Sequence, residues 1–299
     1  APGRGVRTIV DMVVHTRLDC VIGSAALMRQ CAQLAVHHCA ARRAFGKPLL
    51  DQPLMRSVLA DLSIESEAAM TLWVRLAAAL DGAAVGNSAE RDFIRLATAV
   101  SKYWICKRAP AVAYEAMECH GGNGYVEEGP MASLFRQSPL NAIWEGSGNV
   151  ICLDVLRAVA KEPASARALF AELDKSKDVA PPHYGDVVDD LRRTLLGNCD
   201  GDGDGTGSRS MRHLAGLEPG ARSLVDRLAV CLQATTLFQH GDRMVADAFV
   251  ATRLPDPKAH MAGSCLLPTH NLGALPGLVL EPDVVSALID RVAVHGGKE

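Results

Sequence analysis

The sequence lacks a long apolar run. No stretch of 18 apolar residues is free of charged side chains, so a membrane-spanning helix is not expected. It also lacks an excess of one charge: the net charge of −3 excludes a global basic field for nucleic acid or an anionic membrane. With 299 residues, 48% of them hydrophobic, the chain can bury a core, which excludes a disordered tail or a disulfide-stabilised miniprotein.

Cys-x-x-Cys pairs are absent, although the chain has nine cysteines. Such an odd set among apolar neighbours is typical of small buried side chains and predicts no zinc site. We therefore expect a reducing, intracellular compartment, the cytoplasm or alternatively a mitochondrion or other organelle. Residues 1–5 contain neither an initiator Met nor an apolar signal core, so we expect the chain to be the C-terminal part of a longer protein.

Sustained strand-like alternation is absent as well, and helical periodicity takes its place. Apolar residues within 21–39 recur at steps of 3 and 4, which predicts a long first helix ending near residues 46–48. Similar patterns predict three further helices, over 54–82, 88–119 and 146–159. Ser88 is the expected N-cap of the third. Four long helices with short connections predict an all-α fold, an antiparallel four-helix bundle.

The character of the sequence changes near residue 160. We expect two domains, a helical bundle over 1–160 and a helical extension over 161–299 with a mobile Gly/Asp-rich loop near 198–210. The extension is acidic, with 15 Lys and Arg against 19 Asp and Glu. Its helical patches are separated by Pro- and Gly-rich breaks and cover 164–177, 185–197, 219–250 and 283–294.

Three motifs follow one another on the predicted bundle. They are Arg42-Arg43-Ala44-Phe45-Gly46-Lys47-Pro48, His120-Gly121-Gly122-Asn123-Gly124-Tyr125 and Trp144-Glu145-Gly146-Ser147-Gly148-Asn149. Each alone could be a helix end or a turn, but together, at these separations, they resemble the C-terminal helical domain of the acyl-CoA dehydrogenase flavoproteins. Thr16-Arg17, 25 residues before Arg42, fits the same pattern. The segments Thr16-Arg17-Leu18-Asp19-Cys20 and Trp144-Glu145-Gly146-Ser147-Gly148-Asn149-Val150, together with the C-terminal helical extension, are similar to the AidB-like adaptive-response branch.

The resemblance implies FAD as the cofactor. It assigns contacts with the ADP half of FAD to Arg42 and Phe45, across a dimer interface. A guanidinium suits this role because it grips phosphate oxygens through two parallel donors. Gln52, seven residues after Phe45 where the common family pattern has eight, is a further implied contact. The alternative for Arg42 is a surface side chain that the dipole favours at a helix C-terminus.

Two further pairs of residues are implied to contact FAD. Gly121 and Gly122 lack a Cβ, so their backbone can approach a phosphate or ribose closely, unless they merely cap a helix. Ser147 and Asn149 match a hydroxyl and an amide that touch flavin at the start of the last helix. A helix N-terminus suits that position because its free N–H groups face anionic ligands.

The resemblance also assigns the substrate and the chemistry. Arg17 matches a residue that meets the CoA part of an acyl-CoA, the alternative being the polar face of a long helix. Glu145 matches the catalytic base that removes the α-proton of the thioester while the β-hydrogen leaves as hydride to flavin. The alternative for Glu145 is a carboxylate that complements a helix dipole. We therefore expect an FAD-dependent oxidoreductase of fatty acid metabolism, inactive without the N-terminal domains of the family.

Other functions and partners stay open at this stage. The AidB-like branch is associated with double-stranded DNA, and arginines of the extension could form a local patch, although acidic residues interrupt them. A structural subunit with a silent flavin site is a third possibility. The Asp-Gly repeat over 200–205 copies part of a calcium loop, but its twelfth position is Met211, so no metal site is expected. Apolar seams on several helices predict a homo-oligomer.

Overall fold

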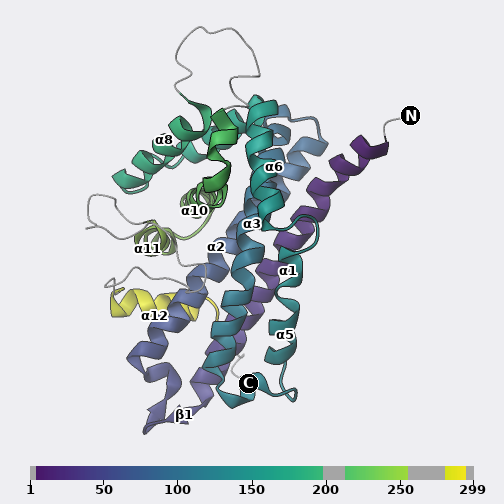
Figure 1. Cartoon of the computed structure of the whole chain (residues 1–299). Helices are drawn as coiled ribbons and strands as arrows, with labels where there is room; N and C mark the ends of the chain where they lie inside the picture. The colour runs from purple at the N-terminus through teal and green to yellow at the C-terminus, as the bar shows by residue number, and fades with distance from the viewer. Residues whose placement is uncertain (1–4, 198–212, 255–279, 294–299) are drawn as a thin grey trace.

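The computed structural model describes residues 5–197, 213–254 and 280–293, and of residues 6–11 only the backbone. Three long helices form its centre: α1 (Gly5–Ala41), α2 (Pro53–Ala84) and α3 (Ser88–Cys119). Figure 1 shows them side by side, with successive helices running in opposite directions. The C-terminal ends of α1 and α3 consequently lie at the same end of the bundle, where the rings of His38 and His120 stack with centroids 4.6 Å apart.

Short elements connect the long helices. Between α1 and α2 lie the antiparallel strands β1 (Arg43–Ala44) and β2 (Lys47–Pro48) and the 3-10 turn η1 (Leu49–Asp51). After α3 come α4 (Gly122–Tyr125), α5 (Met131–Gln137), η2 (Leu140–Ala142) and α6 (Gly148–Lys161). The all-α prediction is confirmed, since β1 and β2 are the only strands in the described ranges. With 14 residues, α6 is the shortest of the four predicted bundle helices and packs on α3.

Three differences between the predicted and the observed helices have a clear physical reason. The first helix ends at Ala41 because residues 43–48 form the hairpin instead. The N-cap of α3 is Asn87 rather than Ser88, and its Oδ1 accepts hydrogen bonds from the amides of Ala89 (3.0 Å) and Glu90 (3.3 Å). The single patch predicted over 219–250 is two helices, because the chain turns at Gly241.

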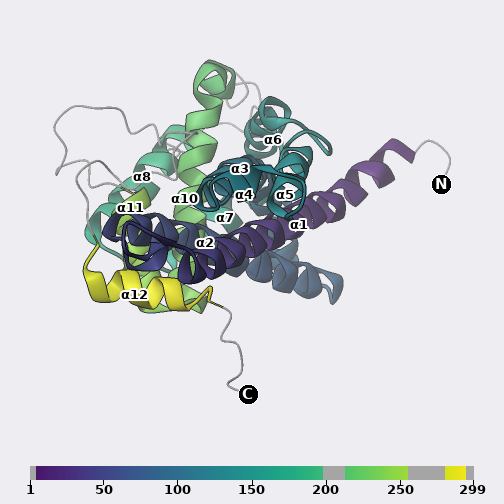
Figure 2. The ribbon, with the colours of Figure 1, turned by 90° about the horizontal axis from the view of Figure 1, so that it is seen from below.

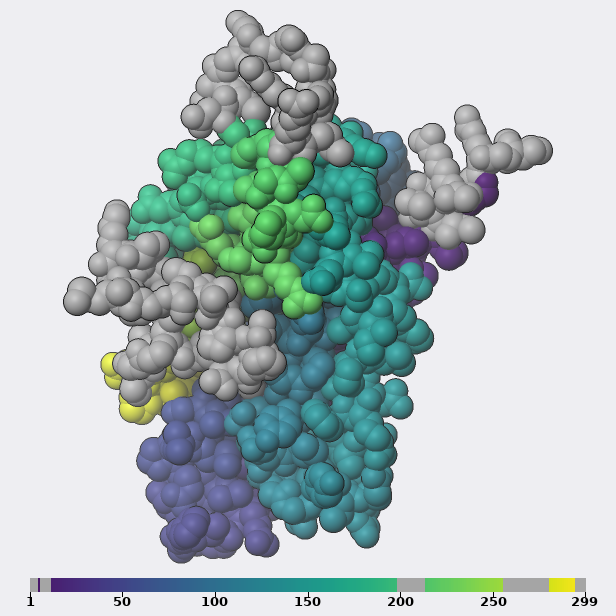
Figure 3. All heavy atoms as spheres, in the orientation of Figure 1, coloured from purple at the N-terminus to yellow at the C-terminus, as the bar shows by residue number. Residues whose placement is uncertain are grey.

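The extension packs directly on the bundle, and in Figure 3 its green atoms lie against the teal atoms of the bundle. It contains α7 (Pro163–Asp174), α8 (Pro182–Leu196), η3 (Glu218–Gly220), α10 (Ala221–His240), α11 (Arg243–Arg253) and α12 (Pro282–Asp290). Helices α7 and α10 contact α3, whereas α10, α11 and α12 contact α2. Figure 2 shows α12 beside α2. One cluster of buried apolar side chains runs through both regions. The two-domain prediction stays a prediction.

Buried ion pairs accompany this apolar contact. Arg253 of α11 bonds Glu65 of α2 (3.0 Å) and pairs with Asp61, while Arg108 of α3 bonds the same Glu65 (2.8 Å). Burial by itself raises the pKa of Glu65, but the two guanidinium groups hold that pKa below its usual value. Removing one partner would leave an uncompensated buried charge, which costs about 3–5 kcal/mol. The network therefore fixes how the extension sits on α2 and α3.

Candidate functional site

The predicted ADP-contacting residues gather at the lower end of the bundle in Figure 1, near β1. Arg42 follows the last turn of α1, and its side chain makes no hydrogen bond or ion pair with any described residue. Phe45 is 98% exposed and has φ 51, in the left-handed region. Gln52 caps the start of α2, and its Nε2 donates to the carbonyl of Ala44 (3.2 Å). An exposed cation and an exposed ring therefore flank the hairpin.

Gly121 and Gly122 lie at the same end, after the last turn of α3. Gly121 has φ 60 and ψ −142, a conformation essentially restricted to glycine, and a Cβ built on either residue would meet nothing within 4 Å. Gly124 differs, because its Cβ would lie 2.3 Å from the carbonyl of Met117. The motif therefore combines one glycine needed for packing with two that leave open space over the backbone. We call Arg42, Phe45, Gln52, Gly121 and Gly122 the hairpin-end cluster.

The remaining predicted residues surround the turn between η2 and α6. Glu145 is exposed with φ 56, and its Oε2 accepts a hydrogen bond from Thr16 Oγ1 (2.9 Å). Arg17 Nε donates to the carbonyl of Glu145 (3.2 Å), and Arg17 Nη1 bonds Asp154 of α6 at 2.7 Å. A left-handed conformation costs about 1–2 kcal/mol for a residue with a Cβ. Contacts with α1 and α6 thus hold a strained turn, and we call Arg17, Glu145, Ser147 and Asn149 the turn cluster.

A buried lysine lies beneath this turn. Lys102 of α3 is 1% exposed, and its Nζ donates to the carbonyls of Trp144 and Gly146, both at 2.7 Å. Burial lowers its pKa below the ordinary value. Hydrogen bonds to a charged group contribute about 1.5–3 kcal/mol each, enough to offset the strain at Glu145. Sequence reasoning missed Lys102, because a single lysine on a helix gives no signal of its burial or of what its ammonium contacts.

The start of α6 carries the last two predicted residues. Ser147 is its exposed N-cap and makes no capping hydrogen bond through its side chain. Asn149 is exposed, and its Oδ1 accepts a hydrogen bond from Arg222 Nε (2.8 Å) of α10. The sequence gives no signal that Arg222 lies beside Asn149. A side chain of the extension therefore reaches the turn cluster.

The two clusters lie far apart on one chain. Arg17 and Ala41 are both on α1, and at 1.5 Å per residue they are about 36 Å apart. The residues near α3 are separated in the same way. Gly121 lies near the C-terminal end of α1, whereas Lys102, beneath the turn cluster, lies near the first half of α1. One dinucleotide cannot bridge that separation. The predicted site residues therefore lie in two separate groups on one chain.

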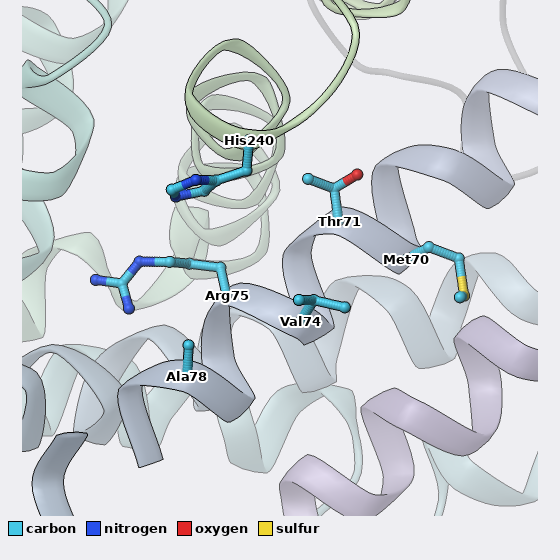
Figure 4. Close-up of a pocket in the computed structure, with 6 residues that line it drawn as sticks. All are labelled: Met70, Thr71, Val74, Arg75, Ala78 and His240. Carbon is cyan, nitrogen blue, oxygen red and sulfur yellow. The ribbon is translucent and has the colours of Figure 1, made fainter. Parts of the chain in front are cut away.

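A pocket between α2 and α10 lies away from both clusters. It has a volume of about 380 Å³ and is lined by Met70, Thr71, Val74, Arg75 and Ala78 of α2 and His240 of α10. Figure 4 shows the side chain of Arg75 among them. Its guanidinium is committed to Glu90 (2.8 Å) and Glu172 (2.7 Å), so it offers no free charge to a ligand. No member of either cluster lines this pocket.

The other sequence-based expectations fall partly outside the described residues. The calcium-like repeat over 200–205 lies there, as do Arg209, Arg212, Cys199 and Cys265. Within the described ranges, no three His, Cys, Asp or Glu side chains are arranged to hold a metal ion. The seven cysteines described are buried and free. None of the helices in those ranges combines the length and apolar character needed to cross a bilayer.

Arginines of the extension that could form a basic patch have acidic partners. Arg192 pairs with Asp174 (2.6 Å), and Arg193 and Arg227 both pair with Asp190, at 3.8 and 2.6 Å. Each of these guanidinium groups thus lies within 4 Å of a carboxylate, and Arg193 and Arg227 share one. A concentrated basic footprint, which duplex binding needs, is absent from the described part of the extension.

Comparison with known proteins gives a consistent family. The family model described as "Acyl-CoA dehydrogenase, C-terminal domain" matches residues 3–160. The chain is 46% identical over 160 residues to the putative acyl-CoA dehydrogenase AidB of Escherichia coli K12, covering 54% of this chain and 29% of that protein. It is 34% identical over 157 residues to acyl-CoA dehydrogenase family member 11 of Caenorhabditis elegans, covering 52% and 25%. The chain therefore spans less than a third of these relatives.

Similarity of structure extends further along the chain than the sequence match. The structure of Caenorhabditis elegans ACDH-11 in complex with C11-CoA superimposes with a TM-score of 0.70 at 26% identity, covering 84% of this chain and 44% of that one. Such coverage includes helices of the extension as well as the bundle. With the family match over half of its length, the chain belongs to the acyl-CoA dehydrogenase family, of which it carries the C-terminal domain.

Proposed function

We propose that this chain is the C-terminal part of an FAD-dependent acyl-CoA dehydrogenase, which oxidises the α,β bond of an acyl-CoA thioester. The observation that carries the proposal is the turn at Glu145. An exposed carboxylate is held there in a left-handed conformation by Thr16 and Arg17, beside the start of α6. A base that abstracts a proton needs such a fixed position facing the substrate. The relatives carry the same family domain.

The hairpin-end cluster has the chemistry that an ADP group requires. Arg42 has all its guanidinium donors available, Phe45 offers an exposed ring, and the open backbone at Gly121 allows close approach. FAD, when bound, supplies the acceptor for the hydride. Because the two clusters are too far apart for one dinucleotide, we infer a homo-oligomer in which one chain supplies the hairpin end and its partner supplies the turn.

The residues of the turn have separate roles in the proposed reaction. Glu145 takes the α-proton of the thioester onto its carboxylate. Thr16 orients that carboxylate through the hydrogen bond to Oε2. Arg17 holds the backbone of the turn, and its Nη2, which bonds no described residue, is available to the CoA portion. Ser147 and Asn149 offer a hydroxyl and an amide to the flavin at the start of α6.

The test is flavin reduction in the assembled enzyme, this chain together with the flavin-binding domains that precede it in the family. We expect Glu145→Gln to slow reduction by a good acyl-CoA by about 1,000-fold, since a base contributes about 10²–10⁴-fold. Glu218→Gln is the matched control, because Glu218 is also exposed and lies at the start of a 3-10 turn. An undiminished rate in Glu145→Gln would exclude the base, and bound flavin that no acyl-CoA reduces would favour a structural subunit.

A further inference from the structure

Lys102 is a charged group buried inside the bundle. Its side chain is among the largest that are fully buried, and no described carboxylate forms an ion pair with it. A buried ammonium is costly unless its donors are satisfied. Two of the three donors go to backbone carbonyls that lie 42 and 44 positions further along the chain.

Those two carbonyls belong to the residues on either side of Glu145. The turn places Glu145 at φ 56 and Gly146 at φ 106, two successive left-handed residues. This arrangement makes the carbonyls of Trp144 and Gly146 converge on one point inside the bundle. A compact ammonium with several donors fits such a point, whereas a planar guanidinium or an acceptor side chain does not.

On the solvent-facing side of the turn, the side chains are exposed rather than buried. With both neighbouring carbonyls drawn inward, the carboxylate of Glu145 stays exposed and accepts a hydrogen bond from Thr16 of α1. Trp144 is half-exposed, and its Nε1 bonds Asn141 Oδ1 (2.9 Å). The backbone is therefore anchored from below while the carboxylate is presented outward.

We propose that Lys102 is a positioning residue, which clamps the two carbonyls beside Glu145 and so sets the direction in which the carboxylate points. This inference rests on the proposed function for its consequence in catalysis, but not for the clamp itself. Lys102 touches no reacting atom in this arrangement. Its effect passes through the backbone of the turn.

The clamp is tested first in the 299-residue chain, without cofactor or substrate. Hydrogen–deuterium exchange of peptides covering 143–148 should be at least about tenfold faster in Lys102→Met, which keeps the length of the side chain but has no donor. Lys102→Gln keeps two N–H donors on a neutral head and should give a smaller increase. Thr98→Val is the matched control, since Thr98 lies one turn earlier on α3, is buried and has an unpartnered hydroxyl. Unchanged exchange in folded Lys102→Met overturns the proposal.

A measurement on the unmodified chain covers the case in which the variants do not fold. Competitive acetylation should modify Lys102 far more slowly than the exposed Lys161 at the end of α6. Equal reactivity of the two amines would show that Lys102 is not held, and would overturn the clamp.

The consequence for catalysis is tested in the assembled enzyme. Lys102→Met should lower kcat by about 100-fold, the effect of a misplacement near 1 Å, and Lys102→Gln should recover part of it. KM should change by less than about threefold, because ground-state binding is not affected. If Glu145→Gln stops flavin reduction and Lys102→Met does not slow it, the positioning role is wrong. If neither variant slows it but exchange rises as expected, the proposed function fails and the clamp stands.

Discussion

The hairpin-end cluster and the turn cluster are built in opposite ways. At the hairpin end, Arg42 has no partner among the described residues and the ring of Phe45 is almost fully exposed. At the turn, Arg17 bonds both Glu145 and Asp154, and the backbone is tied to Lys102. The turn cluster is thus held by contacts within the chain, whereas Arg42 and Phe45 at the hairpin end make no such contacts with the described residues.

This difference indicates what the residues of each cluster need in order to bind or react. Groups that must be aimed precisely, such as a base, gain from being held before the ligand arrives. Groups that bind a phosphate or stack on a ring need a ligand or a second chain to contact. They contribute little to the stability of their own chain. Substitutions of the anchored side chains in the turn cluster should therefore lower stability as well as function, whereas those of Arg42 and Phe45 at the hairpin end should affect binding alone.

The largest expected effect is that of Arg17→Met. It removes the 2.7 Å pair with Asp154 and the hydrogen bond to the carbonyl of Glu145. Leaving a largely buried carboxylate with a weaker partner should lower the free energy of unfolding by about 3 kcal/mol. Urea denaturation measures it, with Arg42→Met as the matched control at the other end of α1, where we expect less than about 0.5 kcal/mol. Equal losses would contradict the contrast between the clusters.

A smaller effect is expected for Gly121→Ala. At φ 60 and ψ −142 an alanine is strained, and we expect a loss of about 1–2 kcal/mol. The neighbouring Gly122→Ala has no positive φ and meets nothing within 4 Å, so its stability should stay within about 0.5 kcal/mol. The pair of melting curves distinguishes backbone strain from crowding. Stability as high in Gly121→Ala as in Gly122→Ala would show that this turn tolerates a side chain.

Acid should weaken the ion pair between Arg17 and Asp154, which anchors the turn cluster to α6. Burial raises the pKa of Asp154, but Arg17 and Arg95 outweigh it and hold that pKa below its usual value. A carboxylate with a lowered folded-state pKa contributes stability above its unfolded pKa of about 4, and loses it as the pH falls through the folded-state value. The unfolding free energy of the unmodified chain should therefore fall more steeply below about pH 4 than that of Asp154→Asn. Parallel slopes in urea titrations would refute this.

The smallest effect on stability is expected for Phe45→Ala. Because its ring is 98% exposed, truncation should change the free energy of unfolding by less than about 0.5 kcal/mol. Binding should respond instead, and sedimentation of the assembled enzyme with FAD should show weaker association of the subunits. A large loss of stability would mean that the ring packs within its own chain.

Local pattern determined a large part of the molecule. Steps of 3 and 4 in the apolar residues predicted the central helices. The ends of α2, α3 and α6 lie within two residues of the prediction, whereas α1 ends at Ala41, before the predicted end near residues 46–48. Turn chemistry is also local: the conformation of Gly121 requires a residue without a Cβ. The family motifs are contiguous segments, and a match over residues 3–160 agrees with them. The roles assigned to their residues stay predictions.

The contacts that shape the turn were decided only by the tertiary structure. Lys102 looks like any polar residue on a helix, until packing buries it beneath the carbonyls of Trp144 and Gly146. Arg222 reaches Asn149 across 73 positions of sequence, from a region that the family match does not include. The sequence by itself determined which residues are helical and which motifs they carry. Only packing decided the partners of each charge, because a buried charge is stabilised by whichever distant groups the fold brings within hydrogen-bonding distance.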